Sequence, residues 1–317
     1  MHPVLERIRT VGLVPVIKLN DPESALPLGR ALVAGGIPVA EITFRTAAAE
    51  EAIRRLAADL PELLVGAGTV LTVEQARIAV DAGARFLVSP ALNPDVVAVA
   101  IDMGIPVVPG VSGPDGVDRA LRLGLEAVKL FPAEATGGLR MLDALSGPYD
   151  TMNFIPTGGI DAANAGEYLK RKNVIAVGGT WMAAPALIEG ADWAGIEAQC
   201  GASALAMHGF SFAHVGINGA SDAEARDRVK LLGSLFGMKF SEGAASFMGD
   251  GIELTKSPFP GEPGHLGIRV NDVGRALAWL ARRGVKPIPG TERWDGTRLK
   301  AVYLELELTG LAVHLVA

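Results

Sequence analysis

Residues 63–83, LLVGAGTVLTVEQARIAVDAG, contain one complete unit of the pattern that decides the fold of this chain. The unit begins with an apolar run (63–70), which is typical of a buried strand, and continues with an Ala-rich stretch that has a helical pattern. Glycine closes this stretch, as is common at the C-terminus of a helix. The unit therefore predicts a strand that is followed by a helix.

The same unit recurs from residue 13 to about residue 180. The apolar runs occupy residues 13–19, 39–44, 63–70, 85–90, 106–111, 127–132, 153–159 and 174–180. Near-continuous apolar strands that alternate with helices indicate a parallel sheet buried on both faces. An open doubly wound sheet is the alternative, but eight units are the number in a (β/α)8 TIM barrel. We therefore predict a TIM barrel over residues 1–207, in which 186–208 form a terminal helix and a small-residue linker.

The pattern changes after residue 208. A strand, a helix and several short strands follow, and this order then recurs, with a boundary near residue 260. Such an internal repeat indicates two copies of one supersecondary unit. We predict an α+β domain of two βαβββ repeats over residues 208–317.

Composition limits the classes of function. Hydrophobic residues make up 49% of the 317 residues, and the net charge is −6. Nothing in this balance favours nucleic acid or an acidic membrane surface as a partner. The only cysteine, Cys200, excludes an internal disulfide, and no apolar run is long enough to span a membrane. We expect a soluble, cytoplasmic protein.

Polar side chains lie at the ends of several predicted strands, where barrels of this kind carry their reacting groups. The most unusual is Lys129, which lies between Val128 and Leu130 in an apolar run. An ammonium group removed from water is strongly destabilising unless it is paired or loses its proton. The other candidates at strand ends are Glu41, Arg45, Thr69, Phe131, Thr157, Gly158, Gly159, Gly178, Gly179 and Thr180. Each taken alone has a structural explanation, such as a turn glycine or an ion pair, but together they favour a site.

These residue types fit one chemistry. Burial disfavours the charged form of an amine, and a neutral amine attacks carbonyl carbons to form a Schiff base. Glu41 can then move protons, Arg45 can bind a carboxylate, and the two Gly-Gly pairs can hold a phosphate through backbone N–H groups. The set predicts a phosphorylated 2-oxo acid as substrate. The alternatives are a barrel that isomerises or decarboxylates without an imine, and a sugar-phosphate-binding protein without turnover.

Six motifs carry a resemblance to a known family. AEITFRT, GAGTV, VSP, VKLFPAE, PTGGI and GGTWM occur in this order over residues 1 to about 205. They resemble the motifs of the 2-keto-3-deoxy-6-phosphogluconate (KDPG) and 4-hydroxy-2-oxoglutarate (KHG) aldolases. The resemblance implies a class I aldolase that cleaves KDPG to pyruvate and glyceraldehyde 3-phosphate, and also KHG to pyruvate and glyoxylate. It further implies that the aldolase needs no cofactor and forms a homotrimer.

The resemblance also implies a role for each matched residue. Lys129 would be the Schiff-base lysine and Glu41 the general acid/base. The remaining residues would contact the substrate carboxylate (Arg45, Thr69), the imine (Phe131), the hydroxyls (Thr157) and the phosphate (Gly158, Gly159, Gly178, Gly179, Thr180). Position 180 departs from the family pattern, which has serine there.

The second predicted domain carries histidines at corresponding places in its two repeats. His214 and His265 lie in the first strand of each repeat, and Glu253 and His314 lie in the last strand. Imidazoles and a carboxylate on facing strands suit zinc, manganese, nickel or iron. The repeat resembles the glyoxalase, or vicinal oxygen chelate, superfamily, although many of its metal-binding members carry glutamate at the position of His314. An isomerase or epimerase activity, a regulatory role, an assembly role and a metal-free module all remain open for this domain.

Overall fold

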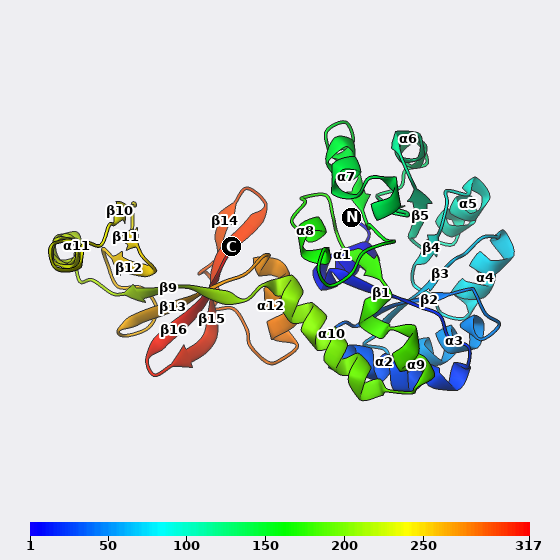
Figure 1. Ribbon diagram of the computed structural model, residues 1–317, viewed down its shortest axis with the longest axis horizontal. Coiled ribbons are helices and arrows are strands. Elements are labelled where there is room, and N and C mark those ends of the chain that lie inside the picture. Colours follow the sequence, from blue (N-terminus) through cyan, green and yellow to red (C-terminus); the bar gives the residue numbers. More distant parts are fainter. The chain divides into compact units, whose positions relative to one another are not determined.

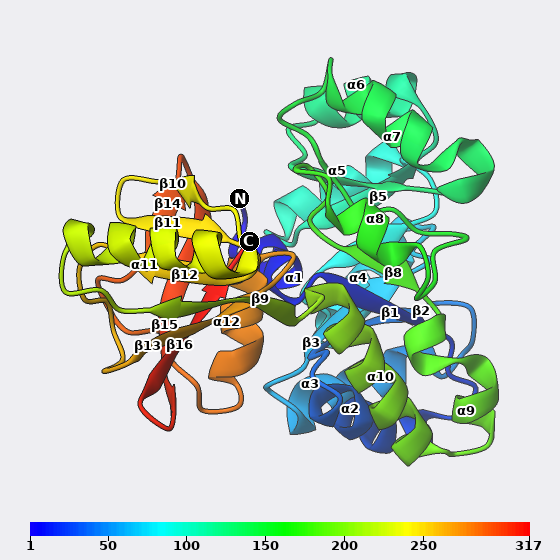
Figure 2. The same cartoon turned by 60° about the vertical axis from the view of Figure 1, so that its left-hand side comes forward.

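The computed structural model describes all of residues 1–317. The chain divides into two compact units, Met1–Met207 and His208–Ala317. Figures 1 and 2 show the chain from two directions, and each unit has an eight-stranded sheet of its own.

The first unit is a barrel of eight parallel strands. They are β1 (Leu13–Ile17), β2 (Val39–Thr43), β3 (Leu64–Gly68), β4 (Leu87–Ser89), β5 (Val107–Val111), β6 (Ala127–Leu130), β7 (Asn153–Phe154) and β8 (Val177–Gly179). Their spatial order is β7-β6-β5-β4-β3-β2-β1-β8. Parallel bridges between Phe154 and Val174 and between Thr157 and Gly178 join the two ends of this order. The predicted (β/α)8 fold is therefore confirmed.

Helices alternate with these strands and surround them (Figure 1). They are α1 (Pro3–Val11), α2 (Ala25–Ala34), α3 (Ala49–Asp59), α4 (Val73–Asp81), α5 (Pro94–Asp102), α6 (Pro114–Arg122), α7 (Gly138–Ser146), α8 (Ala165–Leu169) and α9 (Pro185–Glu189), with 3-10 turns at Pro22–Ser24, Glu134–Thr136 and Trp181–Ala183. Side-chain caps fix several of their starts. Thr72 accepts a hydrogen bond from the N–H of Gln75 at the start of α4, and Asn93 accepts one from Asp95 at the start of α5.

The strands of the barrel are buried on both faces. Every residue of β1, β2, β3, β5 and β6 is buried. This is the environment that the continuous apolar runs predicted. Any charged side chain in these strands is therefore removed from water, and Glu41 in β2 and Lys129 in β6 are the two that occur there.

The prediction of a linker within residues 186–208 is wrong, because Trp193–His208 form one helix, α10. Its small residues are mostly alanine, which favours helix more than any other residue. Ile196, Cys200 and Ala204, each four residues apart, are buried on one face of α10. Gly35 permits the close approach, since a Cβ atom at this position would lie 2.4 Å from Cβ of Cys200.

The second unit contains the predicted βαβββ unit twice. The first copy is β9 (Ser211–Ile217), α11 (Asp222–Phe236), β10 (Ser241–Glu242), β11 (Ser246–Gly249) and β12 (Ile252–Thr255); the second is β13 (Gly264–Arg269), α12 (Val273–Ala281), β14 (Arg293–Asp295), β15 (Arg298–Leu308) and β16 (Leu311–Val316). The copies join where β9 and β13 pair antiparallel. Each helix packs on its own copy, α11 against β11 and β12 and α12 against β15. None of the helices of the chain is both long and apolar enough to cross a membrane.

Candidate active site and candidate metal centre

The charged side chains of the barrel interior form one pair. Nζ of Lys129 donates a hydrogen bond to Oε1 of Glu41 over 3.3 Å, and the two side chains are only 8% and 4% exposed. Lys129 comes from β6 and Glu41 from β2, 88 residues earlier in the sequence. The ring of Phe131 lies beside this pair, with Nζ of Lys129 5.3 Å from the ring centroid. An amine, a carboxylate and an aromatic ring thus converge inside the barrel.

Glycine makes room for the carboxylate of Glu41. Gly68 lies in the neighbouring strand β3, and a Cβ atom there would lie 2.2 Å from Oε1 of Glu41. Real Cβ atoms do not approach an oxygen so closely, so any other residue at 68 would displace the carboxylate. The GAGT motif is therefore required by packing against Glu41, in addition to its strand-end position.

A second polar group lies where β2 and β3 end. Nε of Arg45 donates a hydrogen bond to Oγ1 of Thr69 over 3.3 Å. Arg45 is exposed and its guanidinium forms no ion pair with a carboxylate of the chain. Thr69 has φ of 56°, in the left-handed region that non-glycine residues rarely adopt. Strained backbone of this kind is found preferentially at ligand-binding sites.

The glycine pair after β7 adopts a conformation that favours glycine. Gly158 and Gly159 have φ of 95° and 79°. The segment that follows β6 holds this loop, because the N–H groups of Ala133 and Glu134 donate to the carbonyl oxygens of Thr157 and Gly158 over 2.8 and 3.1 Å. No hydrogen bond within the chain is donated by the N–H of Gly158 or Gly159. These two N–H groups are therefore available to a ligand.

The glycine pair of β8 differs from that after β7. The N–H of Gly178 donates to the carbonyl oxygen of Pro156 over 2.9 Å, so it is not free to bind a phosphate, contrary to the expectation. A Cβ atom at Gly178 would lie 2.4 Å from Oγ1 of Thr157, and one at Gly179 would lie 1.9 Å from the ring of Trp181. These glycines provide space for neighbouring side chains. Thr180, the next residue, is exposed.

The comparisons with known proteins agree with this geometry. Residues 4–199 match the family model described as KDPG and KHG aldolase. The chain belongs to this aldolase family. The first unit is therefore an aldolase, a lyase that cleaves a carbon–carbon bond, and the sequence-based recognition is confirmed.

Individual aldolases are similar over the same part of the chain. The 2-dehydro-3-deoxy-phosphogluconate aldolase of Haemophilus influenzae is 46% identical over 190 residues, which are 60% of this chain and 90% of that protein. The KHG/KDPG aldolase of Escherichia coli K12 is 43% identical over 189 residues, 59% of this chain and 89% of that protein. The crystal structure of the KDPG aldolase of Legionella pneumophila, with pyruvate captured as a covalent carbinolamine intermediate, aligns with a TM-score of 0.61 and 40% identity over 63% of this chain and 97% of that chain.

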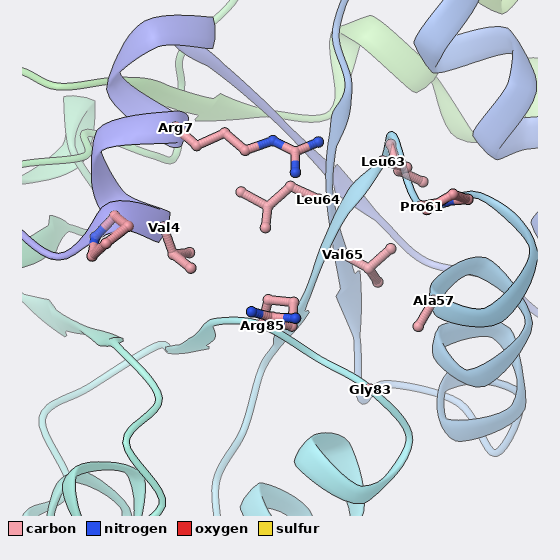
Figure 3. A pocket seen from close by; sticks show the side chains of 10 residues that line it. Val4, Arg7, Ala57, Pro61, Leu63, Leu64, Val65, Gly83 and Arg85 are labelled. Carbon is pink, nitrogen blue, oxygen red and sulfur yellow. The ribbon is translucent and has the colours of Figure 1, made fainter.

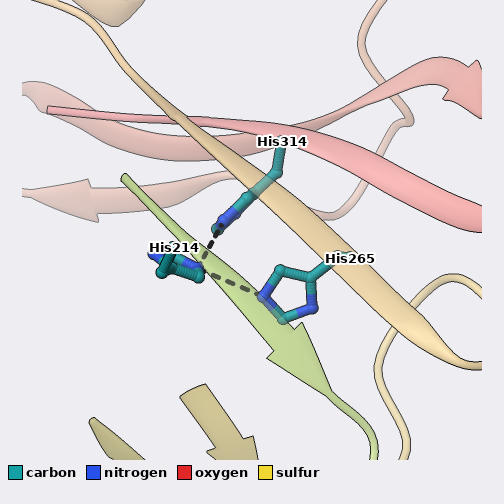
Figure 4. Close-up of side chains that lie close together, drawn as sticks. All are labelled: His214, His265 and His314. Carbon is teal, nitrogen blue, oxygen red and sulfur yellow. Dashed lines mark hydrogen bonds between the residues drawn. The ribbon is translucent and has the colours of Figure 1, made fainter. Parts of the chain in front are cut away.

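The second unit of this aldolase chain brings the four predicted metal-ligand residues together. Figure 4 shows that His214, His265 and His314 point toward one another from three different strands, β9, β13 and β16. Nε2 of His214 lies 3.0 Å from Nε2 of His314, 3.3 Å from Nε2 of His265 and 3.2 Å from Oε2 of Glu253. Oε2 of Glu253 also lies 3.0 Å from Nε2 of His265. All of these residues except Glu253 are less than 9% exposed.

Two repeated glycines permit this convergence. In the pairing of β9 with β13, His214 lies opposite Gly267 and His265 lies opposite Gly216. A Cβ atom at Gly216 would lie 2.0 Å from the ring of His265, and one at Gly267 would lie 2.5 Å from the ring of His214. Each histidine therefore lies over the glycine of the other repeat. The sequence signal of this arrangement is the tripeptide His-x-Gly, which occurs in the first strand of each repeat.

The surroundings of the cluster hold its charges in place. Burial alone would raise the pKa of the Glu253 carboxyl, but hydrogen bonds from His214, His265 and Ser246 hold this pKa well below its usual range. Burial, with the neighbouring His265 and His214, lowers the pKa of His314 to about 3. The cluster therefore contains an ionised Glu253 carboxylate and an uncharged His314. Sequence reasoning missed Ser246, whose Oγ donates to Oε1 of Glu253 over 2.5 Å. It also missed Tyr303, whose ring stacks on His314 at 4.8 Å.

Proposed function

We propose that the first unit cleaves KDPG to pyruvate and glyceraldehyde 3-phosphate through an imine on Lys129, and that it also accepts KHG. The observation that carries the proposal is the buried contact of 3.3 Å between Nζ of Lys129 and Oε1 of Glu41. An amine beside a carboxylate in a dry site can become neutral by passing its proton over one hydrogen bond, without a change in total charge.

The first half of the reaction forms the imine. The neutral Nζ of Lys129 attacks the C2 carbonyl carbon of the 2-oxo acid, and the carbonyl electron pair moves to oxygen. The attacking nitrogen passes one proton to this oxygen, which gives the carbinolamine. The proton held by Glu41 is then added to the carbinolamine hydroxyl, which leaves as water. The product is a protonated imine between Lys129 and C2 and an ionised Glu41.

The second half breaks the carbon–carbon bond. Glu41 removes the proton of the C4 hydroxyl, the C3–C4 electron pair moves into the imine, and glyceraldehyde 3-phosphate leaves. Protonation of the enamine at C3 by Glu41, followed by attack of water on C2, releases pyruvate and restores the amine. Phe131 would pack beside the imine, where its ring favours a nearby positive charge.

The two ends of the substrate would bind at separate groups. Arg45 and Thr69, already hydrogen-bonded to each other, would hold the carboxylate. The free N–H groups of Gly158 and Gly159, with Thr180, would hold the phosphate. Thr157 would face the substrate hydroxyls, while Gly178 and Gly179 would shape this end of the site through the space they leave.

We assign the aldolase to residues 1–207 and a vicinal-oxygen-chelate-like domain to residues 208–317. A homotrimer and a cytoplasmic location are proposed with them. Cys200, the only cysteine, has no second cysteine with which to form a disulfide in the chain, which suits a reducing compartment.

Trapping with borohydride tests the imine. The full chain is incubated with pyruvate and sodium borohydride, and its intact mass and peptide map are measured. We expect one reduced pyruvate adduct on Lys129. Lys18 follows β1, the neighbour of β2, and is the matched control. Lys18→Ala should keep the adduct and Lys129→Met should lose it while still unfolding cooperatively. An adduct on another lysine, or none on the wild-type chain, would overturn the assignment.

A second proposal concerns the histidine cluster, which we infer to be a site for a divalent zinc, manganese, nickel or iron ion. A neutral imidazole has one N–H group, yet Nε2 of His214 lies within 3.3 Å of three acceptor or donor atoms. If it donates to Glu253, it has no lone pair left to accept from His314. A cation bound by His214, Glu253, His265 and His314 would satisfy all of these atoms at once. Such an ion would supply Lewis-acid polarisation of a bound oxygen.

Metal titration tests this site. The full chain is freed of metal with a chelator and titrated with Zn²⁺, Mn²⁺, Ni²⁺ or Fe²⁺, and bound metal is measured by mass spectrometry. We expect one ion per chain. His314→Ala should weaken binding by at least about 100-fold, because even outer-shell changes cost about 10- to 100-fold. His2→Ala, which lies in the first unit, is the control. Equal affinity in both variants would contradict the site.

A further inference from the structure

A pocket of about 510 Å³ opens at the amino-terminal end of the barrel (Figure 3). Its lining comes from α1, the end of α3 and the starts of two strands: Pro3, Val4, Arg7, Ala57, Pro61, Leu63, Leu64, Val65, Gly83 and Arg85. Leu64 and Val65 begin β3, and Arg85 lies just before β4. Arg45 and Thr69 follow the carboxyl ends of β2 and β3. The pocket and the aldolase site therefore lie at opposite ends of the same parallel strands.

Two arginines at this pocket lack carboxylate partners. Neither Arg7 nor Arg85 forms a salt bridge, and Arg7 donates only to the carbonyl oxygen of Glu62. Burial, with the charge of Arg85, lowers the pKa of Arg7. Neighbouring arginines behave differently: Arg9 in α1 pairs with Glu6, and Arg54 in α3 pairs with Glu50. In a chain of net charge −6, two like charges beside one pocket are an uncompensated positive site.

The rest of the lining is apolar. Val4, Leu64 and Val65 present aliphatic side chains to the pocket (Figure 3), and Pro61, Leu63 and Ala57 extend this surface. Pockets that bind small molecules are mostly apolar and carry a few polar groups that fix the ligand's orientation. The planar guanidinium group matches carboxylate and phosphate oxygens. The combination fits a ligand with one anionic group and a carbon body.

We propose that this pocket is a second ligand site of the chain, separate from the aldolase site, and that it binds a small organic anion. The carboxylate or phosphate of this anion lies between Arg7 and Arg85, and its carbon body lies on Leu64 and Val65. The anion would offset the repulsion between the two guanidinium groups, neither of which forms an ion pair with a carboxylate of the chain. The site depends neither on the imine chemistry nor on the metal centre.

Calorimetric titration of the full chain tests the proposal. The probes are phenyl phosphate, benzoate and inorganic phosphate, so that the anionic group and the carbon body are varied separately. Arg7→Gln and Arg85→Gln should each weaken binding of the organic probes by at least about tenfold, the effect of one charged hydrogen bond. Arg9→Gln, on the same helix but outside the pocket, should bind like the wild type. Aldolase turnover should be unchanged in all three variants.

The probes distinguish a phosphorylated ligand from a carboxylic acid. Tighter binding of phenyl phosphate supports a phosphorylated ligand, and tighter binding of benzoate supports a carboxylic acid. Nitrogen-15 NMR of the wild-type chain gives a second readout, in which the Nε–H signals of Arg7 and Arg85 should shift with either probe. Equal affinity in the wild type, Arg7→Gln and Arg85→Gln would place the probes at another site and overturn the proposal. So would the absence of binding by every probe.

Discussion

Lys129 and Glu41 can act together because the fold removes both side chains from water and joins them by one hydrogen bond. Both lie in short apolar runs, and parallel strands bring such runs into one barrel interior. A charged residue in each run is conspicuous, and their contact over 3.3 Å follows from the closed fold. The N–H group of Gly178, by contrast, was wrongly predicted from the sequence. Its position predicted a free N–H group, but the bond to the carbonyl oxygen of Pro156 depends on how β7 meets β8, which no local pattern encodes.

If Glu41 is the acid/base, Glu41→Gln should affect KDPG cleavage and imine trapping differently. The amide keeps the shape of the side chain but cannot accept and return protons, so kcat for KDPG cleavage should fall by about 100-fold or more. Trapping of pyruvate on Lys129 should persist, although more slowly. Steady-state kinetics and adduct mass measure the two effects. Glu50→Gln, which alters only an exposed ion pair with Arg54, is the control, and a kcat equal to that of the control would exclude Glu41 as the acid/base.

His208 predicts a pH dependence of stability. Burial, with the charges of Arg282 and Arg275, lowers the pKa of His208 to about 4. Because an unfolded histidine binds a proton near pH 6.5, the unfolded state holds more protons between these two values. The stability contribution is therefore complete above pH 6.5 and decreases as the pH falls toward 4.

The variant His208→Phe tests this pH dependence of stability. Denaturant unfolding at pH 7 and pH 4.5 should show that the wild type loses roughly 2–3 kcal/mol more than His208→Phe. Phenylalanine suits the site, since the imidazole already packs between Phe210 and Trp279 and its Nε2 has no hydrogen-bond partner. An equal loss in both proteins, or an imidazole that titrates near pH 6.5 by NMR, would show that His208 is not buried in its neutral form.

At the scale of elements, hydrophobic periodicity predicted the eight barrel strands and the two βαβββ repeats, but not every element. The small residues of 186–208 predict a linker after a terminal helix, but α10 continues to His208, because burial against Gly35 is a tertiary contact that the local pattern does not contain. The strand β14, Arg293–Asp295, was missed because three exposed residues have no apolar pattern. Its existence depends on pairing with β15, which is a tertiary contact.

The paired strands β9 and β13 predict the effect of Gly216→Ala and Gly267→Ala. Each added methyl group would enter the ring of the histidine opposite, at 2.0 Å for Gly216 and 2.5 Å for Gly267. We expect each variant to lose metal binding by at least about tenfold, since the histidine must turn away. Gly233→Ala in α11 is the matched control, because its Cβ atom would be 3.4 Å from its nearest neighbour. Metal affinity equal to the control would show that these glycines do not position the histidines.

At the scale of the whole molecule, the net charge does not reveal where positive side chains gather. A value of −6 gave no reason to expect a positive pocket. Arg7 lies in α1 and Arg85 lies just before β4, far apart in the sequence, and only the fold brings them to one pocket. Sequence motifs therefore could not predict this pocket, because its two arginines meet only in the folded barrel.

The two units predict different responses to metal removal. Imine formation by Lys129 needs an amine and a proton acceptor, both supplied by the first unit, so a chelator should leave KDPG cleavage unchanged. A cation that binds only the folded second unit stabilises it by mass action, so the same chelator should lower the melting temperature of that unit. Calorimetric scans and turnover of the full chain, with and without chelator, measure both responses.

The control is His314→Ala, which should melt at the temperature of the chelator-treated wild type in either condition. Restoring metal should reverse the shift only in the wild type. Loss of aldolase turnover on chelation, regained with metal, would contradict an imine mechanism confined to the first unit.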